Sequence, residues 1–379
     1  MKRLLSVALA LLLLTTPVWA TSASSGLDLG AASAVLMEKE TGTVLYEQNP
    51  HEKLEPASVT KIMTLLLIFE ALDSGRISKD DIVTTSAYAA GMGGSQVYLK
   101  EGEQMSVSEM IKCISVVSGN DAAVAMAEHL SGSEQAFVTE MNARAAQLGM
   151  TDTTFVNCTG LPAQGHLTSA HDIALMSREL IANHPGIRDY TTIWMDSIRN
   201  GSFGLTNTNR LIRFYPDATG LKTGSTDGAL YCMSATAERN GMELIAVVMK
   251  SPTSAQRFED AKALLDHGFA SYTLADVYPE IPLPPVDVLL GEEEQVQPQL
   301  SRSCRILVRK GEEKLIQTQT TLAENLAAPV EQGQTIGRLE VLVDGTLRET
   351  IPLVASQSVA RLTISGIFQQ MLQQLMMAK

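Results

Sequence analysis

The sequence of 379 residues predicts an α/β fold, followed by a small all-β domain and a C-terminal amphipathic helix. Strand patterns at both ends of residues 27–278 enclose helical patterns, which indicates one α/β unit whose sheet is assembled from both ends. The segment PEIPLPPVDV, which starts at Pro279, marks a domain boundary. Short alternating apolar runs fill residues 279–356, and helical periodicity follows over 357–379.

Residues 1–20 have the pattern of a secretory signal peptide. Lys2 and Arg3 precede an apolar run over 4–14, and the small-residue segment PVWA ends at Ala20. The apolar run is shorter than a comfortable membrane span. We therefore expect the mature protein to work outside the cytoplasm, although an uncleaved anchor is the alternative.

The first half of the α/β domain shows a hairpin and then a series of helices. Residues 31–47 read as two strands around the turn ETG, and apolar residues recur at helical spacing over 57–74 until Gly75. SVSE, from Ser106, matches a capping box at the start of another helix. Further helical patterns cover residues 121–130, 134–148 and 170–182.

The second half of this domain returns to strands. The runs ALYCMSATAE and MELIAVVMK are joined through Asn240-Gly241, which is a strong hairpin signal. A helix over about 255–269 closes the region. Because strands from both ends flank a helical middle, we expect one sheet assembled from both ends of the domain.

Beyond Pro279 the pattern is that of an all-β domain. Four β-type runs follow one another: CRILVRK, KLIQTQT, GRLEVLVDG and TLRETIPLVA. Asp344-Gly345 joins the last two and predicts a hairpin.

The tail has a wide apolar stripe at three- and four-residue spacing, with glutamines on the other side. We interpret it as a helix on a membrane surface, although packing on its own domain or a dimer seam would give the same pattern. Arg361 and Lys379 are its only cations, so apolar burial would have to drive binding. The stripe consists of Ile364, Ile367, Phe368, Met371, Leu372, Leu375 and Met376.

Composition limits the partners and the redox chemistry. A formal net charge of −13 argues against a nucleic-acid partner, although a local basic patch could still bind other anions. The cysteines show no CxxC spacing, so we expect mostly free or structural thiols, with one disulfide possible. They are Cys113, Cys158, Cys232 and Cys304.

The chemistry begins with EPASVTKIM, in which Ser58 and Lys61 share one face near a helix start. A serine hydroxyl needs a base before it becomes a good nucleophile, and a neutral lysine can serve as that base. Burial or a second cation lowers the pKa of a lysine toward neutrality. About one S-x-x-K is expected by chance in this chain, so the pair alone is a weak signal.

Two further triplets strengthen the signal from Ser58 and Lys61. SGN covers Ser118–Asn120 before a helical run, and KTG covers Lys222–Gly224 at the start of the β-rich region. The order S-x-x-K, S-x-N, K-T-G is the signature of penicillin-binding proteins and class A β-lactamases.

The chain resembles the low-molecular-mass penicillin-binding proteins, the D-alanyl-D-alanine carboxypeptidases of the peptidase S11 type. The resemblance covers about 31–277 and rests on ASVTKIMT, VVSGNDAAVAMAEH, GLKTGSTDGALYCMSATAERNGMELIAVVM and AKALLDHGF. It implies a serine β-lactamase/transpeptidase-like domain, with an antiparallel sheet flanked by helices and a helical subdomain. The β domain, the tail and the signal peptide match the layout of that family.

The resemblance assigns the reacting groups. Ser58 would be the acylated nucleophile and Lys61 its general base. Ser118 would help to pass a proton to the leaving D-alanine, and Asn120 would bind the substrate amide and hold Lys61. The backbone N–H groups of Ser58 and Ser225 would form the oxyanion hole.

It also assigns the binding groups. Lys222 would supply positive charge near the terminal carboxylate and depress the pKa of Lys61. Thr223 and Gly224 would line the strand against which the peptide lies, and Arg257 would help with the carboxylate. Arg210 is a weaker match, with a surface arginine as the equal alternative.

The implied function is removal of the terminal D-alanine from the peptidoglycan stem pentapeptide. β-Lactams would act as covalent inhibitors, and the protein would attach peripherally to the outer face of the bacterial cytoplasmic membrane. The resemblance implies neither a cofactor nor a metal. The sequence has no HExxH and no G-x-S-x-G, and His166 and His171 read as surface or packing histidines.

Three alternatives stay open. A class A β-lactamase would carry a deacylating glutamate, but no Glu-x-x-x-Asn occurs around TDTTFVNCTGL. A transpeptidase or endopeptidase would share the acyl-enzyme and differ in the acceptor. A non-enzymatic wall-binding scaffold is disfavoured by the intact motif residues.

Overall fold

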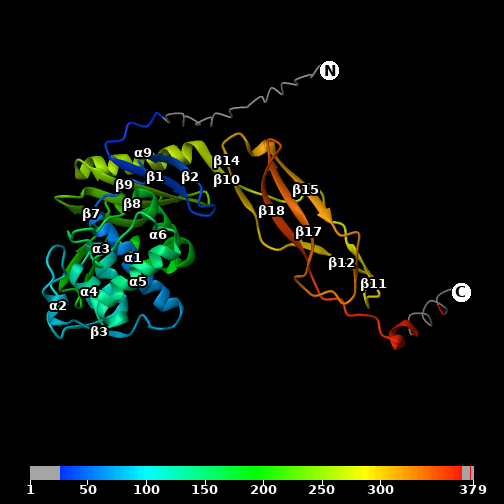
Figure 1. Ribbon diagram of the computed structural model, residues 1–379, viewed down its shortest axis with the longest axis horizontal. Helices are drawn as coiled ribbons and strands as arrows, with labels where there is room; N and C mark the ends of the chain where they lie inside the picture. Colours follow the sequence, from blue (N-terminus) through cyan, green and yellow to red (C-terminus); the bar gives the residue numbers. More distant parts are fainter. Residues whose placement is uncertain (1–25, 369–375, 377–379) are drawn as a thin grey trace, which may run out of the picture.

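A five-stranded antiparallel sheet organises the first domain (Figure 1). The computed structural model describes residues 26–368 and residue 376. The strand order is β2-β1-β9-β8-β7, so the N-terminal hairpin pairs with the strands that come last in the domain. This confirms a sheet built from both ends. The strands are β1 (Ser33–Glu38), β2 (Val44–Gln48), β7 (Ala218–Thr226), β8 (Leu230–Arg239) and β9 (Met242–Ser251).

Local sequence explains the turns of this sheet. Asn240 and Gly241, between β8 and β9, both have positive φ values of 52° and 76°. Such a two-residue turn matches the twist of antiparallel strands, and Asn-Gly adopts it at little cost. β1 is buried at every position, as a central strand covered on both faces must be.

Helices cover both faces of the sheet. α9 (Ser254–Ser271) packs on one face with an apolar cluster that includes Phe258, Leu265 and Phe269. α6 (Ala170–Asn183) and α1 (Lys61–Asp73) lie on the other face, within the larger core cluster. β7 is one of the two edge strands, and its Gly224 packs against the segment that begins α1.

The helical subdomain adds α3 (Val107–Val117), α4 (Asn120–Ser131) and α5 (Glu134–Gln147). The predicted capping box is present: Ser106 Oγ accepts from the Glu109 N–H, and Glu109 reaches back to the Ser106 N–H. Shorter elements complete the domain: η1 (Ala57–Thr60), β3 (Ile82–Thr84), α2 (Ala87–Ala90), β4 (Gln104–Ser106), η2 (Pro185–Ile187), α7 (Arg188–Thr191), β5 (Met195–Ile198), β6 (Phe203–Thr206) and α8 (Leu211–Phe214).

The second domain is β-rich and extends away from the first (Figure 1). Asp344 and Gly345 form the predicted hairpin turn with φ values of 49° and 71°. β10, which precedes the proline-rich break, pairs with β14 of this domain, so the boundary at residue 279 stays a prediction. The strands are β10 (Tyr272–Asp276), β11 (Val286–Leu289), β12 (Gln295–Val296), β13 (Pro298–Leu300), β14 (Arg305–Arg309), β15 (Ile316–Leu322), β16 (Asn325–Ala327), β17 (Thr335–Val343) and β18 (Thr346–Ala355), with η3 at Glu313–Leu315.

The two ends of the chain bear on the remaining expectations. The predicted signal peptide, 1–20, lies outside the described residues, as do residues 369–375 and 377–379 of the predicted amphipathic helix. The helix was predicted to begin at residue 357, but residues 357–363 are not helical, because Val359 and Arg361 form isolated β-bridges with the β domain. Residues 364–368 are helical, and Ile364 and Phe368 are exposed. Within the described part of the chain, no helix combines the length and apolarity that a membrane crossing requires. All four cysteines are free and buried, so the possible disulfide is absent.

Candidate active site

The segment that carries Ser58 is a tight turn leading into α1. Ala57 has a φ of 48°, Ser58 lies in the short 3₁₀ helix η1, and Lys61 is the first residue of α1. A side chain at Gly160 would stand 1.8 Å from the Ala57 carbonyl oxygen, and one at Gly224 would stand 2.7 Å from the Ser58 nitrogen. Only glycine therefore lets the two flanking segments approach this turn.

Lys61 is the centre of the site. Its Nζ lies 3.1 Å from Ser58 Oγ, 2.6 Å from Asn120 Oδ1 and 2.7 Å from the Thr159 carbonyl oxygen. A neutral amine has two N–H donors and one lone pair. The two carbonyl-type acceptors take both donors, so the lone pair is left for the Ser58 hydroxyl. This is the arrangement that a serine nucleophile and its base require.

Burial prepares this amine for base chemistry. Lys61 is fully buried, and this burial lowers the pKa of its amine to about 7. Lys222 is also buried, and burial followed by repulsion from Lys61 lowers the pKa of Lys222 well below its usual range. The sequence-based prediction named burial or a second cation as the cause and expected Lys222 to contribute; burial is the cause that lowers the pKa of Lys61 here.

Ser118 stands at the junction of α3 and α4. It ends α3 with a φ of 66°, and its hydroxyl is buried without a hydrogen-bond partner among the described residues. A buried hydroxyl with no partner is costly, and such groups concentrate where a ligand completes the bonding. Asn120, two residues on, is fixed by donation from Nδ2 to the Gly93 carbonyl at 2.7 Å.

β7 supplies the opposite wall. Lys222 and Thr223 are buried, Gly224 packs on the Ser58 turn, and Ser225 is exposed. Lys222 Nζ donates to the Thr223 carbonyl at 2.9 Å, and Thr223 Oγ1 bonds Thr208 Oγ1 at 2.8 Å. The structure thus brings the S-x-x-K, S-x-N and K-T-G segments to one place.

The two arginines of the sequence-based prediction differ. Arg257, from α9, lies buried beneath β7, where Nη1 donates to the Gly224 carbonyl at 3.2 Å and Nε has no partner in the described chain. Burial lowers its pKa to about 10. Arg210 is exposed and stacks on Phe214, with Cζ 5.8 Å from the ring centroid. The surface reading of Arg210 therefore fits this structure better.

Some contributors were missed because they act through the backbone. The Thr159 carbonyl binds Lys61, and the Gly93 carbonyl positions Asn120, yet neither side chain marks such a role. His166, read from sequence as a surface or packing residue, is buried; Nδ1 accepts from the Val156 N–H, so Nε2 donates to Thr60 Oγ1 at 2.8 Å. Burial lowers the pKa of His166 to about 4 and keeps it neutral.

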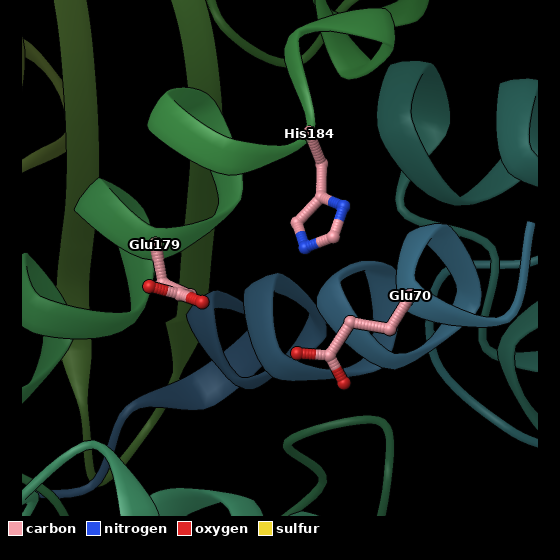
Figure 2. A group of neighbouring side chains, drawn as sticks. All are labelled: Glu70, Glu179 and His184. Atoms are coloured by element: carbon pink, nitrogen blue, oxygen red, sulfur yellow. The ribbon is translucent and has the colours of Figure 1, made fainter. Parts of the chain in front are cut away.

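A cluster at the far end of α1 has the residue types of a metal site. Glu70, Glu179 and His184 point toward one another (Figure 2). However, Arg144 already bonds both carboxylates, at 2.6 Å to Glu70 and 2.5 Å to Glu179, and its charge opposes a bound cation. Lys61 is nine residues from Glu70, about 13 Å along the helix, so the cluster is separate from the candidate site.

Comparison with known proteins agrees with this geometry. The family model of D-alanyl-D-alanine carboxypeptidase, peptidase S11, matches residues 19–253, and that of the penicillin-binding protein 5 C-terminal domain matches 282–361. The D-alanyl-D-alanine carboxypeptidase DacF of Bacillus subtilis is 42% identical over 374 residues, covering 95% of each chain. DacC of Escherichia coli is 34% identical, covering 88% of this chain and 85% of the relative.

Solved structures extend the similarity to the fold. Penicillin-binding protein 5 from Haemophilus influenzae superposes with a TM-score of 0.75 at 31% identity, covering 88% of this chain and 99% of that chain. Penicillin-binding protein D2 from Listeria monocytogenes in its ampicillin-bound form gives a TM-score of 0.59 at 34% identity, covering 64% and 99%. The chain belongs to the peptidase S11 family of D-alanyl-D-alanine carboxypeptidases and has the two-domain fold of penicillin-binding protein 5.

Proposed function

We propose that this serine-type D-alanyl-D-alanine carboxypeptidase removes the terminal D-alanine from peptidoglycan stem pentapeptides through an acyl-enzyme on Ser58. The observation that carries the proposal is the position of Lys61 Nζ, 3.1 Å from Ser58 Oγ and within hydrogen-bond distance of Asn120 Oδ1 and the Thr159 carbonyl oxygen. A pKa of about 7 leaves a large fraction of the amine neutral at neutral pH.

Acylation is a transfer of one proton and one acyl group. Lys61 takes the proton of Ser58, and Oγ attacks the carbonyl carbon between the two D-alanines. The backbone N–H groups of Ser58 and Ser225 stabilise the oxyanion that forms. As the C–N bond breaks, the proton passes from Lys61 by way of Ser118 to the leaving amine. The product is a Ser58 ester and free D-alanine.

Water completes the cycle. Lys61, neutral again, removes a proton from water, and the hydroxide attacks the ester carbonyl. As the C–Oγ bond breaks, Lys61 returns the proton to Ser58 Oγ, and the shortened peptide is released. A β-lactam enters by the same attack, but its leaving group stays tethered within the opened ring. Slow hydrolysis then leaves the β-lactam on Ser58 as a covalent inhibitor.

The substrate ends in a carboxylate, and the charges around β7 suit it. Lys222 and Thr223 line the strand, and Arg257 lies beneath it without any carboxylate partner among the described residues. Cationic groups in a buried wall attract a terminal carboxylate more strongly than solvated ones do. The peptide backbone then adds to the free edge of β7, as in other strand-addition complexes.

A serine β-lactamase is the second candidate because it would use the same acyl-enzyme. The relatives, and the absence of a Glu-x-x-x-Asn pattern around TDTTFVNCTGL, favour the peptidase. A transpeptidase would pass the acyl group to an amine, and a scaffold would form no acyl-enzyme at all.

The decisive experiment combines labelling and turnover. The mature protein is treated with benzylpenicillin and analysed by peptide mass spectrometry, and a pentapeptide ending in D-Ala-D-Ala is assayed for free D-alanine. We expect an adduct on Ser58, and Ser58→Ala should lose both labelling and release while keeping its melting temperature. Ser301→Ala, an exposed serine of the β domain, is the control. Unchanged D-alanine release by Ser58→Ala would refute the proposal.

The location follows from the two termini. We propose that residues 1–20 are a cleaved signal peptide, that the domains cover 27–278 and 279–356, and that the tail beyond them attaches to the outer face of the cytoplasmic membrane through a helix that begins at Ile364. The exposed apolar residues Ile364 and Phe368 support the last point. Truncation after residue 356 should free the protein from vesicles and keep its activity in solution. Equal vesicle binding of both forms would contradict membrane attachment.

A further inference from the structure

A pocket of about 190 Å³ lies beside the nucleophile segment, outside the residues given catalytic roles. Its lining includes Lys53 and Glu55, which precede the Ser58 turn. It also includes Gly228 and Lys250, the latter near the end of β9. The volume suits the charged end of one amino-acid side chain.

The pocket holds unpaired charges of both signs. The Glu55 carboxylate and the Lys250 amine have no hydrogen-bond or ion-pair partner within the ranges that the structure describes. Lys53 has only a loose contact with Asp152, at 3.8 Å. One carboxylate between two ammonium groups is complementary to a ligand group that carries an ammonium and a carboxylate together.

The backbone is bent to place Lys250 there. The pairing of β8 with β9 changes register at Tyr231–Met233, which leaves a β-bulge in β9. Lys250 lies in this bulge and has a φ of 57°. A left-handed backbone is unfavourable for lysine, and β-bulges redirect side chains at functional sites. Its N–H is held by Cys232 Sγ at 3.5 Å.

The direction of the bound peptide leads to this pocket. A side chain at Gly224 would contact the Ser58 nitrogen, and one at Gly228 would contact the Glu55 carboxylate, so β7 and its turn run beside residues 55–58. With the terminal carboxylate near Lys222 and the scissile carbonyl near Ser58, the upstream residues extend past Ser225 toward Gly228. The three residues from Ser225 to Gly228 span at most about 10 Å. A long side chain on the residue that precedes the penultimate D-alanine can therefore reach the pocket.

We infer that this pocket is a specificity subsite for a diamino dicarboxylic acid in the third position from the peptide's C-terminus, an inference that rests on the proposed function. Glu55 binds the ammonium group at the end of its side chain, and Lys250 and Lys53 bind the carboxylate on the same carbon. A lysine side chain in this position satisfies Glu55 alone.

Four peptides of the form N-acetyl-X-D-Ala-D-Ala test the subsite. X is meso-diaminopimelate linked through its L-centre, whose side chain presents both an ammonium and a carboxylate group, or one of three comparison residues. L-lysine presents only the ammonium group, L-α-aminoadipate only the carboxylate, and L-norleucine neither. We expect the protein to cleave the diaminopimelate peptide with a kcat/KM about tenfold above that of the norleucine peptide. Glu55→Gln should remove the preference for peptides with a side-chain ammonium group. Lys250→Asn should remove the preference for peptides with a side-chain carboxylate, and asparagine tolerates the positive φ at this position. Lys314→Met, in the β domain, should keep both preferences.

The readout is a ratio of kcat/KM values for two peptides, so partial loss of active enzyme in a variant cancels. Equal cleavage of all four peptides by a protein that is acylated on Ser58 would overturn the subsite and leave the proposed function standing. A preference that survives both substitutions would also overturn it. Absence of both penicillin labelling and D-alanine release would instead refute the proposed function, and the subsite with it.

Discussion

The two domains fill their interiors with different kinds of side chain. Among the described residues, every buried polar or charged side chain precedes residue 261, and these include Lys61, Asn120, Lys222 and Arg257. Within the second domain, residues 277–359, the buried side chains are all apolar or cysteine. Burying charge costs stability unless partners compensate, so its concentration in one domain marks where the chemistry is done.

Among the changes that test this difference between the domains, removal of the buried base Lys61 should have the largest effect on activity. Lys61→Met keeps the length of the side chain and removes the amine, so Ser58 loses its proton acceptor. We expect kcat/KM for D-alanine release to fall by about 10²–10⁴. Lys314→Met, which removes an exposed lysine of the β domain, is the matched control and should leave kcat/KM unchanged. Equal activity in both variants would remove the difference between the two domains.

The converse experiment damages the apolar domain. Leu339 is fully buried in the sheet of the second domain, and Leu339→Ala should lower the free energy of unfolding of that domain by about 2–5 kcal/mol. Release of D-alanine at 25 °C should stay within twofold, because no residue of the site comes from beyond Arg257. Scanning calorimetry with a parallel activity assay measures both.

Leu65→Ala, at an equally buried position of α1, is the matched variant and should reduce the amount of active enzyme. Loss of penicillin labelling in Leu339→Ala at 25 °C would show that the two domains fold as one unit.

The same contrast explains what the sequence could predict. In the β domain, alternation and the Asp344-Gly345 turn predicted β14, β15, β17 and β18, because strand period and turn chemistry are local. In the first domain, the hairpins and long helices were equally clear, and the order of the three motifs pointed to one site. The joining of β1 to β9 followed from strand patterns at both ends of a helical region.

The parts that sequence could not predict depend on backbone atoms and burial. No side-chain pattern identifies the Thr159 carbonyl as a partner of Lys61, because any residue carries the same group. Burial, rather than the charge of Lys222, dominates the pKa of Lys61, and burial depends on how distant segments pack. Arg210 fell outside the site because α8 turns its side chain onto Phe214.

The pH dependence of acylation tests the effect of burial directly. The pKa of Lys61 is lowered from its usual value to about 7, and only the neutral amine accepts the Ser58 proton. The acylation rate should therefore rise about tenfold per pH unit below 7 and level off above it. Stopped-flow measurement with a fluorescent penicillin between pH 5.5 and 8.5 gives the profile. A rate independent of pH over this range would contradict a titrating Lys61.

The smallest expected effect concerns the partnerless hydroxyl of Ser118. Its removal in Ser118→Ala takes away a buried polar atom that has no hydrogen-bond partner among the described residues. The free energy of unfolding should therefore rise by about 1 kcal/mol while D-alanine release falls, because proton transfer to the leaving amine loses its relay. Chemical denaturation and turnover assays on the same preparation measure both changes.

A second substitution separates the hydroxyl from the backbone. Ser118 holds a φ of 66°, a conformation that favours glycine, so Ser118→Gly should be more stable than Ser118→Ala and equally impaired in turnover. Thr321→Ala, an exposed hydroxyl of the β domain, should change neither quantity. If Ser118→Ala were less stable than the parent protein, its hydroxyl would have to be bonded in the folded state. The unsatisfied group would then no longer distinguish the interior of the first domain from that of the second.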